Sequence, residues 1–91
     1  MRDIQLDVFP DRVFLRFDHQ DGRLGRFYLL KVQPDLFSGA SLIREWGWIG
    51  TESQMRMEKY RDEGQAVDAL YSVVRSKCNL GYCVRFDHQW G

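Results

Sequence analysis

The segment Leu42-Ile43-Arg44-Glu45-Trp46-Gly47-Trp48-Ile49-Gly50-Thr51 concentrates two of the three tryptophans, an arginine and two glycines within ten residues. Side chains of a β-strand alternate between two faces, so a strand here separates two sets. One face carries Leu42, Arg44, Trp46 and Trp48, and the other carries Ile43, Glu45, Gly47 and Ile49. We expect the aliphatic set to face the core. The cation and the rings then form a surface rich in residue types that dominate binding interfaces. The alternative is that both rings belong to the core, where most tryptophans are largely buried.

Two residues of this strand need a special explanation. A glycine inside a strand usually marks a bulge or a close approach of backbone, and Gly47 is expected to do the same. Strict alternation places Glu45 on the inward face, where a lone carboxylate is costly. Either a bulge near Gly47 turns Glu45 outward, or Glu45 pairs with an inward-reaching cation such as Lys59.

Period-two alternation predicts further strands on both sides of this segment. They span residues 4–8, 12–19, 25–33, 54–60 and 82–88. Shared faces are expected for Val13, Leu15 and Phe17, and for Tyr28, Leu30 and Val32. Asp-Gly predicts a turn within residues 20–23, and Pro10 and Asp11 form another turn. Met55 and Met57 are expected to face the core, and the loop residues Leu36 and Phe37 are expected to tuck back onto the sheet.

The period then changes to that of a helix. Asp62, followed three residues later by Gln65, fits a capping box at the helix start. A stripe at helical spacing follows, formed by Ala66, Ala69, Leu70, Val73, Val74 and Lys77. Gly81 is the expected C-terminal stop. The chain is therefore predicted to be one domain, residues 1–91, of the α+β class. Its antiparallel β-sheet has about five to six strands, with one α-helix packed across one face.

Composition limits the classes of function. Thirteen basic residues balance thirteen acidic ones, so the chain lacks the overall basic charge of strong non-specific nucleic-acid binders. Ten of the thirteen cations are arginine, which suits bidentate phosphate contacts and stacking. Two cysteines are too few for a disulfide scaffold. We expect neither a signal peptide nor a membrane-spanning run. We expect a soluble, cytoplasmic protein without a cofactor, membrane contact or small-molecule ligand.

Some residues suggest a catalytic or a metal site, but each of these patterns is incomplete. Arg16-Phe17-Asp18-His19-Gln20 recurs as Arg85-Phe86-Asp87-His88-Gln89, which could bring His19 and His88 to one metal. Two histidines without a third fixed ligand are too few for a zinc site. Cys78 could be proposed as a nucleophile with His88, but its place beside the apolar helix stripe favours a packed thiol. Cys83, within a strand, is interpreted in the same way. No phosphate-loop or nucleophile-elbow pattern occurs, so the chain is not expected to be an enzyme.

The segment Arg44-Glu45-Trp46-Gly47-Trp48-Ile49-Gly50-Thr51, followed by Gln54, resembles the signature of the WGR domain. That module is named for Trp-Gly-Arg, usually followed by Ile or Val and Gly. Upstream, residues 27–37 are similar to the strand and loop that lead into the signature in bacterial members. Downstream, Lys77-Cys78-Asn79-Leu80-Gly81-Tyr82 matches the closing Lys-x-x-x-Gly-Tyr of the family. The resemblance covers most of the chain.

The resemblance implies an α+β fold and a function without catalysis. In poly(ADP-ribose) polymerases the module binds DNA near a strand break, and its signature tryptophan packs against the terminal nucleotide. By position, Trp46 takes the stacking role and Gly47 the close-approach role. Trp48 stands where the family has arginine, and Ser53 replaces the glycine that usually precedes Gln54. Tryptophan has no charge and one donor, so it cannot replace a guanidinium, although it could extend a stacking platform.

Two functions of different classes follow. The first is a non-catalytic module that binds nucleic acid, at DNA ends or nicks or single-stranded segments. The second is a protein–protein interaction module that uses an exposed patch of Trp46 and Trp48. If Met55 and Met57 face the core, Arg56 shares a face with Trp46, and Arg75 and Lys77 on the helix are candidate phosphate contacts. The candidate binding residues are therefore Arg44, Trp46, Gly47, Trp48, Arg56, Arg75 and Lys77.

Overall fold

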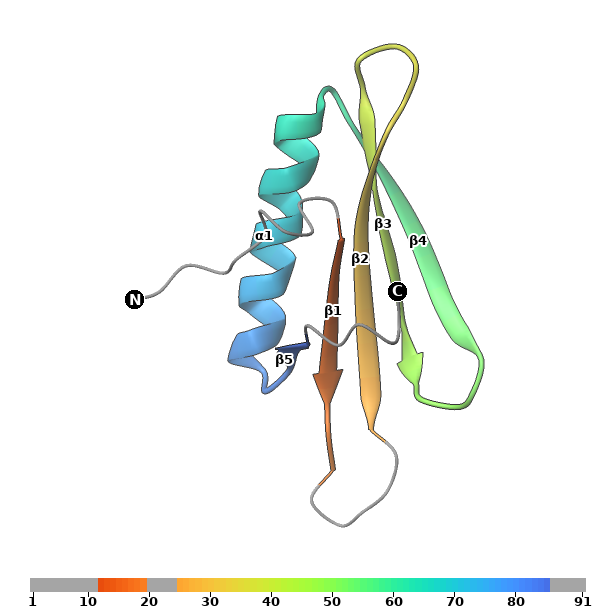
Figure 1. The fold of residues 1–91 in the computed structure, drawn as a ribbon, viewed down its shortest axis with the longest axis vertical. Coiled ribbons are helices and arrows are strands. Elements are labelled where there is room, and N and C mark those ends of the chain that lie inside the picture. The colour runs from red at the N-terminus through yellow and green to blue at the C-terminus, as the bar shows by residue number, and fades with distance from the viewer. Residues whose placement is uncertain (1–11, 20–24, 86–91) are drawn as a thin grey trace.

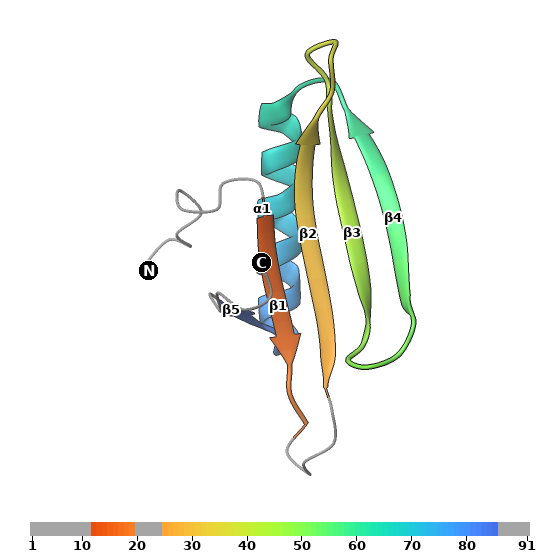
Figure 2. The ribbon, with the colours of Figure 1, turned by 45° about the vertical axis from the view of Figure 1, so that its right-hand side comes forward.

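The computed structural model describes residues 12–19 and 25–85. In order, these residues form β1 (Arg12–Phe17), β2 (Arg26–Pro34), β3 (Ala40–Trp48), β4 (Ser53–Tyr60), α1 (Glu63–Asn79) and β5 (Cys83–Arg85). The strands make one antiparallel sheet in the order β4-β3-β2-β1-β5. Helix α1 lies along one face of this sheet (Figures 1 and 2). The predicted α+β class, with one helix on an antiparallel sheet, is confirmed.

The hydrophobic core lies between α1 and the sheet. The helix contributes Ala66, Leu70 and Val74, all of which are fully buried. The strands contribute Val13, Leu15, Tyr28, Leu30, Val32, Ala40 and Leu42. The faces predicted for β1 and β2 are therefore confirmed. One helix stripe and three strands thus supply the core. Burying each large aliphatic side chain in this layer stabilises the fold by about 1.5–3 kcal/mol.

Both ends of α1 are capped by the residues that the sequence indicates. The Asp62 carboxylate accepts a hydrogen bond from the Gln65 backbone N–H at 2.8 Å. The Gln65 side chain reaches back to the backbone N–H of Arg61 at 3.2 Å, one residue earlier than in a standard capping box. At the other end, the N–H groups of Gly81 and Tyr82 donate to the carbonyls of Cys78 and Lys77, each at 3.0 Å. With Gly81 at φ 111°, this is a Schellman motif.

The two faces of β3 and β4 are inverted relative to the prediction. Leu42 is fully buried under α1, so the face that it shares with Arg44 and Trp46 is the helix side of the sheet. Met57 pairs with Ile43 on the opposite side, where Met55 and Met57 are 66% and 56% exposed. The expectation that these methionines face the core is wrong. Strand β4 is an edge strand, and α1 packs mainly against β2 and β3.

The same inversion resolves the predicted difficulty at Glu45. Glu45 lies on the helix-free face, and the Ser53 hydroxyl donates to its carboxylate at 2.6 Å. The pairing of β3 with β2 and β4 continues through Gly47 without a bulge. Lys59 is opposite Ser41, so it does not pair with Glu45, and it is exposed rather than directed to the core. Both explanations offered for an inward Glu45 are therefore wrong.

The loop between β2 and β3 does not fold back onto the sheet. Leu36 and Phe37 are 93% and 87% exposed, which contradicts the prediction. The loop closes on its own backbone instead. The Asp35 carboxylate accepts from the N–H groups of Phe37 and Gly39 at 2.7 and 3.0 Å. These bonds form a tight turn whose apolar side chains stay exposed.

Some predictions concern residues outside the described ranges. These are the strand at 4–8, the turns at 10–11 and 20–23, and the part of the last strand beyond Arg85. Within the described residues, no helix combines the length and the apolar character needed to cross a bilayer.

Replacing Gly81 with alanine should destabilise the fold. A Cβ atom at Gly81 would lie 2.8 Å from Cε2 of Phe17, and the residue has φ 111°. The left-handed conformation alone costs an L-residue about 1–2 kcal/mol, and the contact adds to that. Urea unfolding of Gly81→Ala should show this loss in the free energy of unfolding. Ser76→Ala, at an exposed position in the same helix, is the control. Equal midpoints for the two variants would contradict the assignment of the cap.

Candidate functional site

Both signature tryptophans lie on the helix side of the sheet. Trp46 is opposite Tyr28 and Trp48 is opposite Arg26 in the β2–β3 ladder. The start of β2, the end of β3, the last turn of α1 and β5 all lie at one end of the molecule (Figure 1). Trp46 is partly buried there, whereas Trp48 is 48% exposed. The rings therefore lie between the core and the surface, and only Trp48 has a large exposed area.

Tyr28 connects Trp46 to the cations around it. The rings of Tyr28 and Trp46 are stacked, with centroids 5.5 Å apart and planes 10° apart. The Lys77 Nζ atom lies 4.6 Å from the centre of the Tyr28 ring. The Arg44 Nε–H donates to the Tyr28 hydroxyl at 2.9 Å. Tyr28 is only 4% exposed, and it thus holds Trp46, Lys77 and Arg44 in fixed positions at the edge of the core.

Arg44 and Arg56 share one carboxylate. Arg44 contacts Glu58 Oε2 at 3.1 Å, and Arg56 contacts the same oxygen at 3.3 Å. Partial burial acts to lower the pKa of Arg44, but the hydrogen bond to Tyr28 and the charge of Glu58 outweigh burial and raise it. Arg44 therefore stays charged. Burial, and next Glu58, raise the pKa of Tyr60, so its hydroxyl stays protonated. One positive charge remains unneutralised in the Arg44–Glu58–Arg56 cluster.

Trp48 contacts a residue of β2 and a residue of the segment that follows β1. The His19 ring is stacked on it, with centroids 5.4 Å apart and planes 7° apart. The Arg26 Cζ atom lies 5.5 Å from the centre of the Trp48 ring. It also lies 4.9 Å from the centre of the Phe17 ring and 5.9 Å from that of Tyr82. A guanidinium is therefore held among three aromatic rings.

The closing Lys-x-x-x-Gly-Tyr motif has a structural role in this arrangement. The cap at Gly81 turns the chain so that Tyr82 packs against Phe17 with ring centroids 5.4 Å apart. Lys77, in the last turn of α1, reaches the Tyr28 ring. We call the resulting region the tryptophan surface, and it consists of His19, Arg26, Tyr28, Trp46, Trp48, Lys77 and Tyr82. The Arg44–Glu58–Arg56 cluster flanks it.

The structure separates two of the predicted site residues from the others. A Cβ atom at Gly47 would lie 3.1 Å from the Glu52 carbonyl oxygen and 3.2 Å from Ser53 Cα. Gly47 thus allows close approach of the chain's own β3–β4 hairpin. Arg75 is exposed and lines a shallow depression with Ser72, Ser76, Asn79 and Leu80. By contrast, Arg44, Trp46, Trp48, Arg56 and Lys77 all lie in or beside the tryptophan surface.

Four residues of the tryptophan surface are not among the predicted binding residues, and one of them, His19, enters the sequence analysis only as a possible metal ligand. Tyr28 was assigned only to a buried face, and Tyr82 only to the family motif. Arg26 was not singled out, although it lies two residues before Tyr28 and therefore on the same face of β2. Continuing that alternation back to the strand start could have identified it. Its position opposite Trp48 depends on the β2–β3 register, which alternation within one strand does not specify.

The metal and thiol hypotheses gain no structural support. His88 lies outside the described residues, and His19 stacks on Trp48. Among residues 12–19 and 25–85, no group of three or more histidine, cysteine or acidic residues could hold a metal. Cys78 and Cys83 are free thiols. Burial, and next the neighbouring Cys83, raise the pKa of Cys78, which lowers its thiolate fraction.

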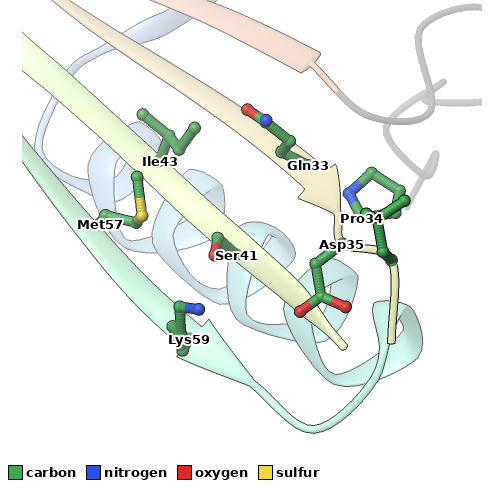
Figure 3. A pocket seen from close by; sticks show the side chains of 8 residues that line it. Gln33, Pro34, Asp35, Ser41, Ile43, Met57 and Lys59 are labelled. Atoms are coloured by element: carbon green, nitrogen blue, oxygen red, sulfur yellow. The ribbon is translucent and has the colours of Figure 1, made fainter. Parts of the chain in front are cut away.

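The helix-free face carries a second feature. Near the β2–β3 loop, a cavity of about 350 Å³ is lined by Gln33, Pro34, Asp35, Leu36, Ser41, Ile43, Met57 and Lys59. Figure 3 shows Ile43 and Met57 side by side at one end of this cavity, with the helix behind the strands. The cavity is therefore separated from the tryptophan surface by the full thickness of the sheet.

The chain is thus a helix-backed antiparallel sheet that carries a surface of aromatic rings and cations at one end. The family model of the WGR domain matches residues 11–89, and the chain belongs to this family. An uncharacterized protein of Sinorhizobium fredii, y4dW, is 32% identical over 73 residues. The match covers 80% of this chain and 36% of that protein, so the chain spans about a third of its relative's length. No solved structure matches the chain.

Removing the Tyr28 hydroxyl should destabilise the domain. Tyr28→Phe keeps the ring against Trp46 and Lys77 but leaves the partly buried Arg44 Nε–H without its acceptor. Hydrogen bonds to charged groups contribute about 1.5–3 kcal/mol, and the partial exposure of Arg44 places the expected loss near the lower end. Urea unfolding measures this loss. Tyr71→Phe is the control, because the Tyr71 hydroxyl makes no hydrogen bond within the described residues. A loss no larger for Tyr28→Phe would show that the hydroxyl does not hold Arg44.

Proposed function

We propose that this chain is a non-catalytic nucleic-acid-binding module that acts through the tryptophan surface. The observation that supports it most is the charge on the helix side of β2, β3 and β4. Those strands place Arg26, Arg44 and Arg56 on this side with a single carboxylate, Glu58, and α1 adds Lys77. Four cations against one carboxylate leave three positive charges beside exposed aromatic area. Phosphates and bases require this pairing of features, although the whole chain has no net charge.

The two tryptophans have different proposed roles. Trp48 is the contact residue, because it has the exposed area on which a base or sugar could pack. Trp46 lies deeper, where it stacks on Tyr28 and packs against the core. The resemblance alone assigns the stacking role to Trp46, whereas this proposal assigns it to Trp48. The change follows from their different depths in the sheet, because the exposed area of Trp46 is limited by its contacts with the core.

The preferred ligand is an end or a single-stranded segment of DNA. A flat ring contributes most when a base is not already stacked on its neighbours, and such bases occur at ends, nicks and single strands. The family supports this preference, because WGR domains of poly(ADP-ribose) polymerases bind DNA near strand breaks. The proposal places the binding event in the cytoplasm and involves no cofactor.

Protein binding is the second candidate, and a specific observation favours it. The exposed area of the Trp46 and Trp48 patch, which the sequence suggests for protein binding, is small because Trp46 is partly buried. The helix-free face instead exposes Met55 and Met57, and Met57 lines the cavity near the β2–β3 loop. Exposed apolar groups of this kind occur at protein interfaces. The two candidates therefore use opposite faces of one sheet, so matched variants can separate them.

Trp48→Ala should weaken binding to an oligonucleotide that has a recessed or nicked end. Loss of a stacking contact worth about 1–3 kcal/mol corresponds to an increase in Kd of about 5- to 150-fold. Fluorescence anisotropy with a labelled duplex at several salt concentrations measures it. Met55→Ala is the matched control, because Met55 is similarly exposed but lies on the opposite face. The wild-type Kd should rise steeply with salt, since phosphate contacts release counterions.

Two results would contradict this proposal. One is the absence of binding at low salt by a wild-type protein that is folded by circular dichroism. The other is equal Kd values for wild type and Trp48→Ala, with a loss in Met55→Ala instead. The first result would favour the protein-interaction candidate, and the second would move the nucleic-acid site to the helix-free face.

A further inference from the structure

The Arg26 guanidinium has no acceptor for its hydrogen-bond donors among the described residues. Its Nε atom is buried and has no hydrogen-bond partner, although the residue as a whole is partly exposed. No ion pair with a described residue is formed by Arg26 either. Arg44 and Arg56 differ, because both contact the Glu58 carboxylate. A buried donor without an acceptor is costly, so its presence calls for an explanation.

The aromatic rings explain how the charge is tolerated without an acceptor. Phe17, Trp48 and Tyr82 all lie within 6 Å of Arg26 Cζ, where the negative ring faces attract a cation. These ring faces attract the charge of the guanidinium, but they are poor hydrogen-bond acceptors for its N–H groups. A guanidinium has five donors in a fixed fork, which matches the oxygens of a phosphate. Arg26 is thus held among three rings while its Nε–H has no acceptor.

A second unpartnered atom lies next to the same rings. His19 Nε2 is buried without a hydrogen-bond partner, and within the described residues it and Arg26 Nε are the two buried side-chain polar atoms in this condition. The His19 ring is stacked on Trp48 and contacts Phe17 edge-on with centroids 6.0 Å apart. Arg26 contacts the same two rings. Two buried nitrogen atoms without hydrogen-bond partners therefore lie beside the same half-exposed ring.

The β2–β3 register gives this set a specific relation to the signature. Trp48 occupies the position where the family has arginine, and its partner in the ladder is Arg26. Side chains opposite each other on one face of a sheet are close neighbours. The cation that is missing at position 48 is therefore present on the adjacent strand, directly opposite Trp48.

We propose that Arg26 and His19 form an anion site that binds one phosphate group of the nucleic acid, beside the base or sugar that packs on Trp48. This proposal rests on the proposed function and names the residues that replace the missing signature cation. The phosphate is either an internal diester or a terminal monoester, because both present the same oxygens to the guanidinium fork.

Arg26→Gln should weaken oligonucleotide binding and reduce its salt dependence. Loss of one charged contact should raise Kd about tenfold or more, and should lower the slope of log Kd against log salt by about 0.9 for a duplex. Arg26→Lys keeps the charge and should retain most of the slope. Arg75→Gln, which removes an exposed arginine outside the tryptophan surface, should leave both quantities unchanged. Thermal unfolding by circular dichroism confirms that each variant is folded.

Two versions of the duplex distinguish the source of the phosphate, one ending in a terminal phosphate and one in a hydroxyl. A preference for the phosphorylated end that is lost in Arg26→Gln assigns a terminal monoester. Equal weakening on both duplexes assigns an internal diester. His19→Phe keeps a ring against Trp48 and removes both nitrogens, so it should raise Kd about 2- to 10-fold. An unchanged Kd in this variant would remove His19 from the site.

Failure of this inference differs from failure of the proposed function. If Arg26→Gln binds both duplexes with the wild-type Kd and slope while Trp48→Ala loses binding, the function stands and the anion site is wrong. If the folded wild type binds neither duplex, the function fails. The Arg26 Nε–H resonance, followed by NMR during titration with inorganic phosphate, then decides the anion site alone. A saturable shift that is absent for the Arg56 Nε–H resonance supports the site, and no shift overturns it.

Discussion

The contacts of Tyr28 determine how the core of this domain continues into its surface. The ring packs in the core, stacks on Trp46 and lies under Lys77, while its hydroxyl accepts from Arg44. These partners come from the strand that contains the signature and from the last turn of α1. Because one buried residue holds them together, folding of the core also fixes the relative positions of the rings and cations. The tryptophan surface is therefore already arranged before any ligand binds, and this lowers the entropic cost of binding.

The helix side of the sheet serves two purposes along its length. Beneath α1, the alternating positions of β2 and β3 are Leu30, Val32, Ala40 and Leu42, which make the core. Toward the C-terminal end of α1, the residues on this same side of β2 and β3 are Arg26, Tyr28, Arg44, Trp46 and Trp48. The period of the strands does not change, but the cover provided by the helix ends. A continuous face thus passes from core to candidate binding surface without a bulge or a break in the ladder.

The sequence predicts the strands, the helix caps and the shared face of Leu42, Arg44, Trp46 and Trp48. It fails at the choice of which face the helix covers. Met55 and Met57 are more apolar than Arg56 and Glu58, so patterning in β4 favours the wrong side, and only the position of α1 decides the question. Arg44 can lie on the helix side because Tyr28 and Glu58 supply acceptors from other strands. Arg26 is missed for a similar reason, since its neighbour Trp48 follows from register rather than from local pattern.

The central claim is that nucleic acid binds the helix side of the sheet, at its end near the last turn of α1. An NMR titration with a single-stranded or recessed-end oligonucleotide tests it most directly, since one sample reports on both faces. We expect the Trp48 indole N–H and the Arg26 Nε–H resonances to shift together and saturate, while the methyl resonances of Met55 and Met57 stay in place. Shifts of the Met55 and Met57 methyl groups, with Trp48 and Arg26 unchanged, would contradict the account and place binding on the opposite face.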